Sequence, residues 1–191
     1  MKKRTRHAVA LFFLKLACLA LGLFLTACAF TQGFTRFKVT TLKPGEPLPM
    51  TDCIYVMLPH DYKKSGKVEV GSGLAVQKAL QEALLGPLEK KVIAQTPQGL
   101  DEALSSARQA PCVYLVQIEI LDWYDPPAFI QTAADRGEIN IKLFLVENGK
   151  MLRLDNITCS GAAATVNHIG SYSPNDCLKP GMQKWATMAF H

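Results

Sequence analysis

After one continuous apolar run near the N-terminus, the hydrophobic positions of this chain follow two different periods. Short apolar runs at 53–59, 90–94 and 112–121 predict strands that are covered on both faces. Between them, apolar residues recur three and four positions apart at 72–85 and 96–107, which predicts two amphipathic helices. This strand–helix–strand–helix–strand order requires parallel pairing with right-handed crossovers.

The pattern changes in the C-terminal third of the chain. Residues 138–146 and 150–158 alternate between apolar and polar side chains on either side of an Asn-Gly pair, a typical hairpin turn. A Ser-Pro pair at 173–174 predicts a capped helix start, and Pro180 predicts a break before a last helix. We therefore predict an α/β fold with a three-layer, parallel βαβαβ core, extended at one edge by an antiparallel hairpin (an α+β addition). The predicted strand order is 2-1-3-4-5, followed by a C-terminal helix.

The net charge of +5 belongs to the N-terminus and not to the predicted domain. All 16 acidic residues follow Cys28, and removing the five basic residues that precede it from the total of 21 leaves 16 basic residues, a net charge of zero. A neutral domain argues against a phosphate-binding surface, so no nucleic-acid partner is predicted. The five basic residues are Lys2, Lys3, Arg4, Arg6 and Lys15.

The N-terminus has the layout of a secretory signal, with a cationic start, an apolar centre at 16–25 and small residues after it. A transmembrane helix over 8–27 is the competing interpretation, but it would place Lys15 inside the apolar span at a cost of roughly 2.5–3.5 kcal/mol near the bilayer centre. An ordinary cleaved secretion signal is the third possibility.

The stretch LTAC, which ends at Cys28, resembles the lipobox of bacterial lipoproteins. That resemblance implies cleavage after residue 27 and attachment of lipid, palmitate included, to Cys28. Ala29 stands where an aspartate would retain such proteins in the inner membrane, which implies an outer-membrane location facing the periplasm. We expect a signal peptide at 1–27, a lipidated tether at 28–50 with three prolines near its end, and a single domain at 51–191.

Four cysteines remain in the predicted domain: Cys53, Cys112, Cys159 and Cys177. In an oxidising compartment they allow three disulfide pairings. Cys53 and Cys112 precede two strands predicted to be adjacent and parallel, which favours a Cys53–Cys112 bond and leaves Cys159 to pair with Cys177. The chain has no Cys-x-x-Cys pair and no histidine at ligand spacing, so neither a metal nor a cofactor is predicted.

Polar and aromatic side chains follow the predicted adjacent strands at their carboxyl ends, where open α/β sheets bind ligands. As a binding rim they offer an apolar platform with polar groups around it. As an acid–base site, His60 would act with Asp122 or Asp125 in a periplasmic hydrolase or glycan-processing enzyme. Plainer interpretations are that Trp123 covers the core edge and that His60 is a solvated loop residue. The candidate rim consists of His60, Ser72, Asp122, Trp123, Tyr124 and Asp125.

Ser72 is predicted to cap the helix at 72–85. The glycines that flank it either serve the helix start or, less specifically, cradle an anion. The chain carries no nucleophile elbow, P-loop or zinc-protease motif. We therefore predict no enzymatic activity.

From Cys53 to its C-terminus, the chain resembles a family of Gram-negative bacterial lipoproteins known only as a domain of unknown function. The resemblance is carried by IYVMLP, GSGLAVQKALQEAL, LDEALSSARQAPCVYLVQIEILDWYD, EINIKLFLVENGKML and SYSPNDCLKPGMQKWATMAF. The stretch GAAATVNHIG departs from the more aromatic, glycine-rich segment of that family. Such domains resemble the N-terminal α/β domain of TolB. The resemblance implies a non-enzymatic module that binds an envelope protein or assists envelope assembly.

Overall fold

The computed structural model describes residues 36–49, 52–86, 90–126, 134–161 and 173–191. The predicted signal peptide and Cys28 lie outside these residues, so their predictions remain untested. No helix in the described part of the chain is long and apolar enough to cross a membrane.

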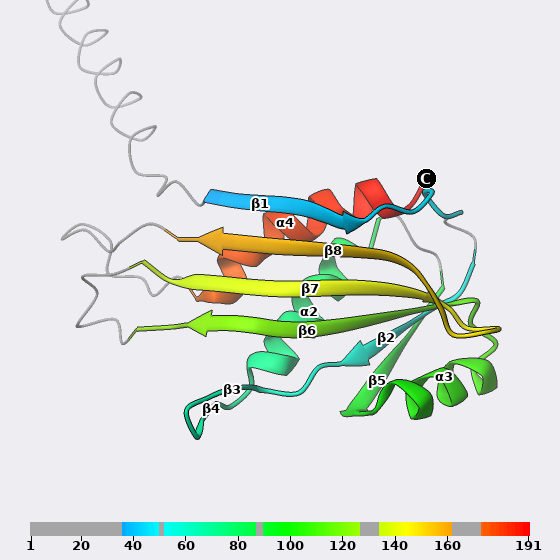
Figure 1. Ribbon diagram of the computed structural model, residues 1–191, viewed down its shortest axis with the longest axis horizontal. Coiled ribbons are helices and arrows are strands. Elements are labelled where there is room, and N and C mark those ends of the chain that lie inside the picture. Colours follow the sequence, from blue (N-terminus) through cyan, green and yellow to red (C-terminus); the bar gives the residue numbers. More distant parts are fainter. Residues whose placement is uncertain (1–35, 50–51, 87–89, 127–133, 162–172) are drawn as a thin grey trace, which may run out of the picture. The chain divides into compact units, whose positions relative to one another are not determined.

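Six strands form one mixed sheet in the order β1-β8-β7-β6-β2-β5 (Figure 1). β2 is parallel to both of its neighbours, whereas every other pairing is antiparallel. A small separate hairpin joins β3 to β4. The strands are β1 (Arg36–Lys43), β2 (Ile54–Leu58), β3 (Tyr62–Lys64), β4 (Lys67–Glu69), β5 (Lys91–Pro97), β6 (Tyr114–Tyr124), β7 (Arg136–Leu145) and β8 (Lys150–Ser160).

Helices cover both faces of the sheet, which confirms an α/β architecture. α2 (Ser72–Ala83) and α4 (Pro174–Ala189) pack on one face, and α3 (Leu100–Gln109) packs on the other. Along β2, Ile54 and Val56 point into the core shared with α2 and α4. Tyr55 and Met57 point into the core shared with α3, as alternation along a strand requires. α3 covers the sheet only near β2, β5 and β6, so no helix of the described residues covers most of the same face of β7, β8 and β1 (Figure 1).

The predicted order 2-1-3-4-5 is incomplete because the sheet has a sixth strand. The five predicted strands are neighbours in the predicted order, but β1 pairs antiparallel with β8 and forms the edge. β1 comes from residues expected in the tether at 28–50, and Leu48 also bridges Phe190, so the domain begins before residue 51. Only alternate residues of β1 face α4, and they are only partly buried, which leaves a weak hydrophobic pattern.

Two local predictions around the helices were wrong. Ser72 is the first residue of α2 and not its cap, because Gly71 takes that position with a φ of 86°. α4 runs without a break through Pro180. The start of α4 is capped, as predicted, by a capping box that Ser173 and Asp176 form. The missing N–H of Pro180 is tolerated because apolar residues before and after it, such as Leu178 and Met182, are fully buried on the core.

Both predicted disulfides are present. Cys53 and Cys112 are bonded with their Cα atoms 4.4 Å apart, and Cys159 and Cys177 are bonded at 5.7 Å. The first bond joins the segments that precede the adjacent parallel strands β2 and β6. The second ties the end of β8 to the first turn of α4.

Candidate functional site

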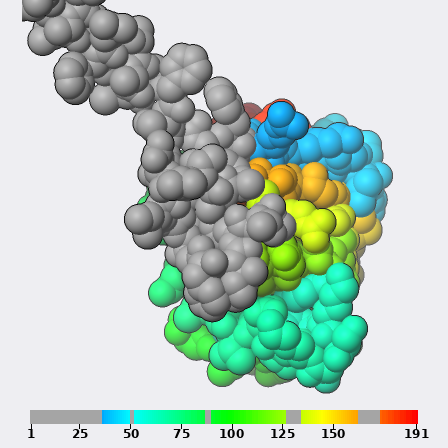
Figure 2. All heavy atoms as spheres, turned by 90° about the vertical axis from the view of Figure 1, so that its left-hand side faces the viewer, coloured from blue at the N-terminus to red at the C-terminus, as the bar shows by residue number. Residues whose placement is uncertain are grey.

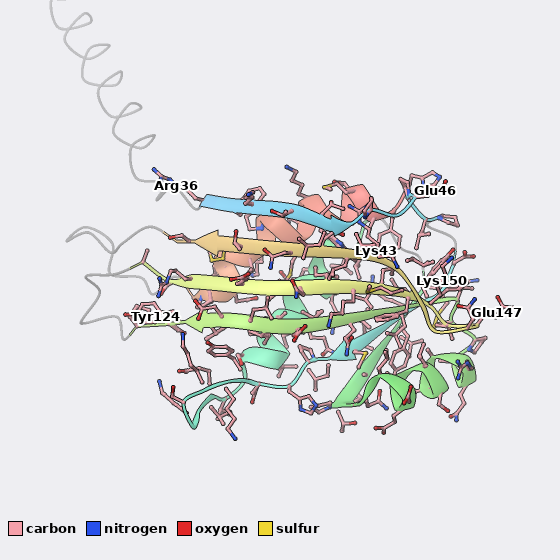
Figure 3. The ribbon with its side chains drawn as sticks, viewed as in Figure 1. Arg36, Lys43, Glu46, Tyr124, Glu147 and Lys150 are labelled. Carbon is pink, nitrogen blue, oxygen red and sulfur yellow. A yellow bond between two sulfur atoms is a disulfide. The ribbon has the colours of Figure 1, made fainter. Side chains whose placement is uncertain are left out.

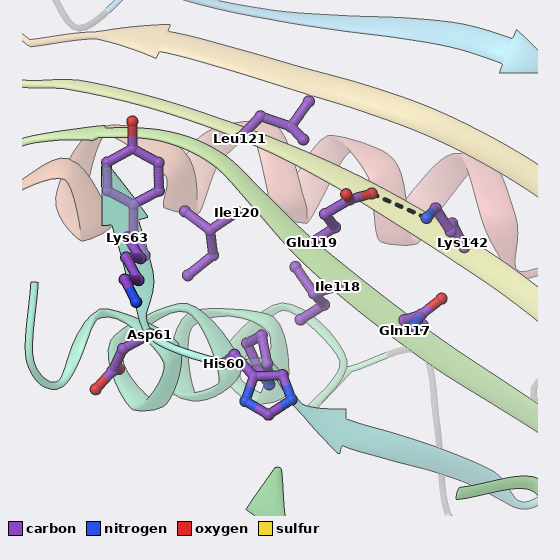
Figure 4. Close-up of a pocket in the computed structure, with 11 residues that line it drawn as sticks. His60, Asp61, Lys63, Gln117, Ile118, Glu119, Ile120, Leu121 and Lys142 are labelled. Atoms are coloured by element: carbon purple, nitrogen blue, oxygen red, sulfur yellow. Dashed lines mark hydrogen bonds and ion pairs between the residues drawn. The ribbon is translucent and has the colours of Figure 1, made fainter. Parts of the chain in front are cut away.

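An open groove lies where β2 and β6 separate. The two strands pair only as far as Val56 and Val116, after which β6 continues and β2 ends at Leu58. The groove has a volume of about 460 Å³ and is bounded by residues 59–63, residues 117–121 of β6, and Lys142 (Figure 4). It lies at the carboxyl end of β2, where the predicted binding rim was expected.

Ser72 and the loop before it hold α2 in place. The Ser72 hydroxyl accepts a hydrogen bond from the Tyr62 backbone N–H at 2.8 Å and is buried. The Asp61 carboxylate accepts from the N–H groups of Gly71 and Gly73 at 3.1 and 2.9 Å. The chain's own carboxylate therefore fills the anion position at the start of this helix.

Asp122 is bonded to the β3–β4 hairpin. Its carboxylate accepts a hydrogen bond from the Tyr62 hydroxyl at 3.1 Å and lies 3.6 Å from the Lys64 ammonium. Burial raises the pKa of Tyr62, and the hydrogen bond to Asp122 raises it further. Asp122 thus links β6 to the hairpin through side chains.

The acid–base arrangement considered from the sequence is not assembled in the described part of the chain. His60 lines the groove and is exposed, and no described hydrogen bond or ion pair joins it to Asp122 or Asp125. Trp123 is buried in the core beside α2 and α4, in keeping with its plainer interpretation. Among the described residues, no three histidine, cysteine or acidic side chains are grouped to hold a metal ion.

The last two rim residues lie at the end of β6. The Tyr124 ring is 38 % exposed, and the Arg136 guanidinium carbon lies 5.0 Å from its centroid, a cation–π contact across β6 and β7. Desolvation raises the pKa of Asp125, and the Glu69 carboxylate adds to this effect.

Sequence analysis missed Asp135, which is only 2 % exposed. One of its carboxylate oxygens, Oδ1, is buried and has no hydrogen-bond partner among the described residues. Burial raises the pKa of Asp135 to about 6, and the carboxylates of Asp125 and Asp176 contribute to the rise. A lone aspartate in a polar stretch carries no sequence signal of burial, because its environment is built from β6, β7 and α4.

An apolar depression, also missed, lies beside the groove at the carboxyl ends of β2 and β5. It has a volume of about 720 Å³. Three of its residues are exposed apolar side chains: Val68 at 44 %, Val70 at 89 % and Leu74 at 48 %. Leu58 and Pro97 line it from the two strand ends. Val68 and Val70 lie in the polar segment between the predicted strand at 53–59 and the predicted helix at 72–85, so their gathering with Leu74 depends on the β3–β4 hairpin.

Comparison with known families and structures gives a fold and a family. The family model described as "Domain of unknown function (DUF4823)" matches residues 46–188. No curated protein sequence matches the chain.

Solved structures show the same fold in other proteins. The PelC dodecamer from Paraburkholderia phytofirmans is similar with a TM-score of 0.55 and 17% identity, covering 78% of this chain and 98% of that chain. A leucine-to-methionine variant of the same dodecamer gives a TM-score of 0.54 and 17% identity over 80% and 99%. Lipoprotein GNA1162 from Neisseria meningitidis is less similar, with a TM-score of 0.41 and 14% identity over 62% and 90%. At these identities the likeness to PelC shows the fold alone.

Proposed function

This chain belongs to the DUF4823 family, and we propose that it is a lipid-anchored envelope protein that acts without catalysis, by binding a protein partner. Lipid at Cys28 would hold it on the outer membrane, facing the periplasm. The lipobox-like LTAC stretch and two disulfides, which suit an oxidising compartment, support this proposal.

The apolar depression beside β2 and β5 carries the partner-binding part of the proposal. Val68 of β4, Val70 just after it and Leu74 in the first turn of α2 all line this depression. Contiguous apolar surface on a soluble domain marks interaction sites, because covering it removes apolar area from water. The polar groove beside it would supply the rim of such an interface.

The fold shared with PelC supports a second element of the proposal, assembly with further copies. PelC forms a dodecamer. We include self-assembly in the proposed function of this chain, alongside binding of a different envelope protein.

Partner binding is tested by capture of the tagged full-length protein from crosslinked membranes. Val70→Asp places a charge in the apolar depression and should reduce recovery of a specific partner at least tenfold. Leu85→Asp is the matched control, because Leu85 is 66 % exposed but does not line the depression. Equal recovery with both variants would remove the depression from the proposal.

Anchoring is tested by metabolic labelling with palmitate. Cys28→Ser should abolish the label and release the protein from the membrane fraction. A Cys28→Ser protein that keeps its label would contradict attachment at this residue.

A further inference from the structure

β1 leaves one edge of the sheet open. Only β8 pairs with β1, and Figure 1 shows no described element beyond it on the outer side. The pairing with β8 is regular from Arg36 to Thr41, and a register shift interrupts it before Lys43. Residues 36–41 therefore form a regular edge of the kind on which a further strand can pair.

The register shows which backbone groups of this edge are free. The Gly161 N–H donates to the Asp135 carbonyl at 2.8 Å, so the odd-numbered residues of β8 direct their backbone groups toward β7. The even-numbered residues of β8 then bond to β1, opposite Arg36, Lys38 and Thr40. The N–H and C=O groups of the alternate residues of β1 point outward, away from every described strand. These residues are Phe37, Val39 and Thr41.

The same stretch carries positive charge without an acidic partner. The Arg36 and Lys38 side chains are exposed, and no described hydrogen bond or ion pair joins either side chain to another residue. Both lie on the face of β1 opposite to α4, as alternation along the strand requires. Lys43 adds a positive charge near the far end of β1, which has no acidic residue (Figure 3). A segment that pairs with this edge should therefore carry acidic side chains on that face.

The other face of β1 supplies apolar contact. Phe37 lies beside Gly181 of α4 but remains 38 % exposed, and Val39 packs partly on the core. Apolar side chains of an added strand would cover the exposed part of the Phe37 ring, because neighbouring strands place the side chains of one face side by side. The edge thus fits an extended segment in which acidic residues alternate with apolar ones.

We infer that the outer edge of β1 binds an extended segment of another envelope protein, with acidic side chains opposite Lys38 and apolar ones opposite Phe37 and Val39. The inference takes the envelope location from the proposed function and adds a second contact on a different surface. Figure 2 shows β1, in blue, and the β3–β4 hairpin that holds part of the apolar depression, in cyan to green, at different edges of the described surface.

The edges of the six-stranded sheet in a second copy do not offer such a segment. A β1–β1 contact would bring Lys38 against like charges. β5 forms the other edge of this sheet, and it carries Lys91 and no acidic residue. Antiparallel β1–β1 pairing would also point the two N-terminal ends in opposite directions, whereas Arg36 lies eight residues after Cys28, at most about 28 Å of extended chain from the predicted lipid. A different protein therefore fits this edge better than a copy does.

Binding of a synthetic peptide to the purified full-length protein in detergent tests this pattern. The probe is a short labelled peptide in which valine alternates with glutamate. One control peptide has lysine in place of glutamate, and the block peptide has the composition of the probe with every valine before every glutamate. We expect the probe to bind at least tenfold more tightly than either control by fluorescence anisotropy, and to slow hydrogen exchange of the backbone within residues 36–41.

Substitutions in β1 separate this edge from other surfaces. Val39→Pro removes an N–H that points outward and not one bonded to β8, so the protein should fold while its affinity for the probe falls at least tenfold. Val39→Ala is the matched control, because it shortens the same side chain and keeps the N–H, and its affinity should stay close to that of the wild type. Lys38→Glu should weaken binding of the probe and strengthen binding of the lysine peptide. Thermal unfolding midpoints show that each variant folds.

Three results would overturn the inference: no binding of the probe, equal affinities for the probe and the block peptide, or equal affinities of folded Val39→Pro and Val39→Ala for the probe. An assembly of copies that Val39→Pro dissociates would also overturn it, because a second copy would then occupy the edge. Partner capture through Val70 and palmitate labelling at Cys28 do not depend on β1, so such results leave the rest of the proposed function standing.

Discussion

The indole Nε1 of Trp185 donates a hydrogen bond to Asp155 Oδ2 at 2.9 Å, and both side chains are completely buried. The same carboxylate accepts hydrogen bonds from Nε and Nη2 of Arg153 at 2.5 and 3.1 Å, and from the Thr41 hydroxyl at 2.6 Å. Arg153 also donates to the Met188 carbonyl at 3.2 Å. One buried carboxylate thus ties β8 to α4 and to the edge strand β1.

Asp155→Asn should lower the free energy of unfolding by about 3–5 kcal/mol, because it leaves the Arg153 charge buried without its partner. Trp185→Phe, which keeps the ring and removes only the donor, should cost about 1–3 kcal/mol. Urea denaturation of both variants measures the difference. An Asp155→Asn protein as stable as the Trp185→Phe protein would contradict the central role of this carboxylate.

Gly181→Ala should destabilise the protein although alanine favours helices by about 1 kcal/mol over glycine. A Cβ at residue 181 would lie 2.5 Å from Cγ2 of Ile157, where α4 crosses β8. Overpacking of this kind costs about 1–3 kcal/mol. In an Ile157→Ala background the same change should become neutral or stabilising, and a double-mutant cycle by thermal unfolding checks this coupling. Equal effects in both backgrounds would show that the loss of stability does not come from the contact between residue 181 and Ile157.

Loss of the Cys53–Cys112 disulfide should destabilise more than loss of the Cys159–Cys177 disulfide. The first closes a loop of 59 residues and the second one of 18. Loop-closure entropy predicts about 4 and about 3 kcal/mol for these loops. Paired serine substitutions, compared by chemical denaturation, test the order; the reverse order would show that the two bonds act mainly through the folded state.

The stability contributed by Asp135 should fall as the pH rises. Its pKa is about 6 in the folded protein against 3.8 for an unperturbed carboxyl, so the folded state binds the proton more tightly than the unfolded chain. The free energy of unfolding should therefore decrease between about pH 4 and pH 6 and stay lowered above it, by at most about 3 kcal/mol.

Asp135→Asn should remove this decrease, so that its stability relative to the wild type grows from pH 4 to pH 7. Glu147→Gln, at an exposed turn, is the control and should follow the wild type. Parallel curves for Asp135→Asn and the wild type would show that this carboxyl does not titrate in the range.

Of the six candidate rim residues, only His60 is among those that line the groove; Ser72, Asp122, Trp123, Tyr124 and Asp125 are not. The carboxyl ends of β2 and β6 follow from the strand order, and His60 does line the groove found there. The sequence could not show that Asp61 and Ser72 are bonded to the start of α2, because these contacts depend on how the loop folds back. For the same reason, the exposed valines of the β3–β4 hairpin were not predicted to gather.

The sequence by itself predicted the order of the five central strands, and it favoured one of the three possible cysteine pairings. The buried side chains of β7 and β8 alternate along each strand, so a shift of one residue would turn them out of the core. β2 is almost wholly buried, as its continuous apolar run predicts. Only the tertiary structure decided that β1 joins the sheet and that α4 continues through Pro180. Both depend on contacts with distant residues: Thr41 with Asp155, and the buried face of α4 with β8. Local propensity is too weak to overrule such contacts, so the edge and the last helix took their form from the core they pack on.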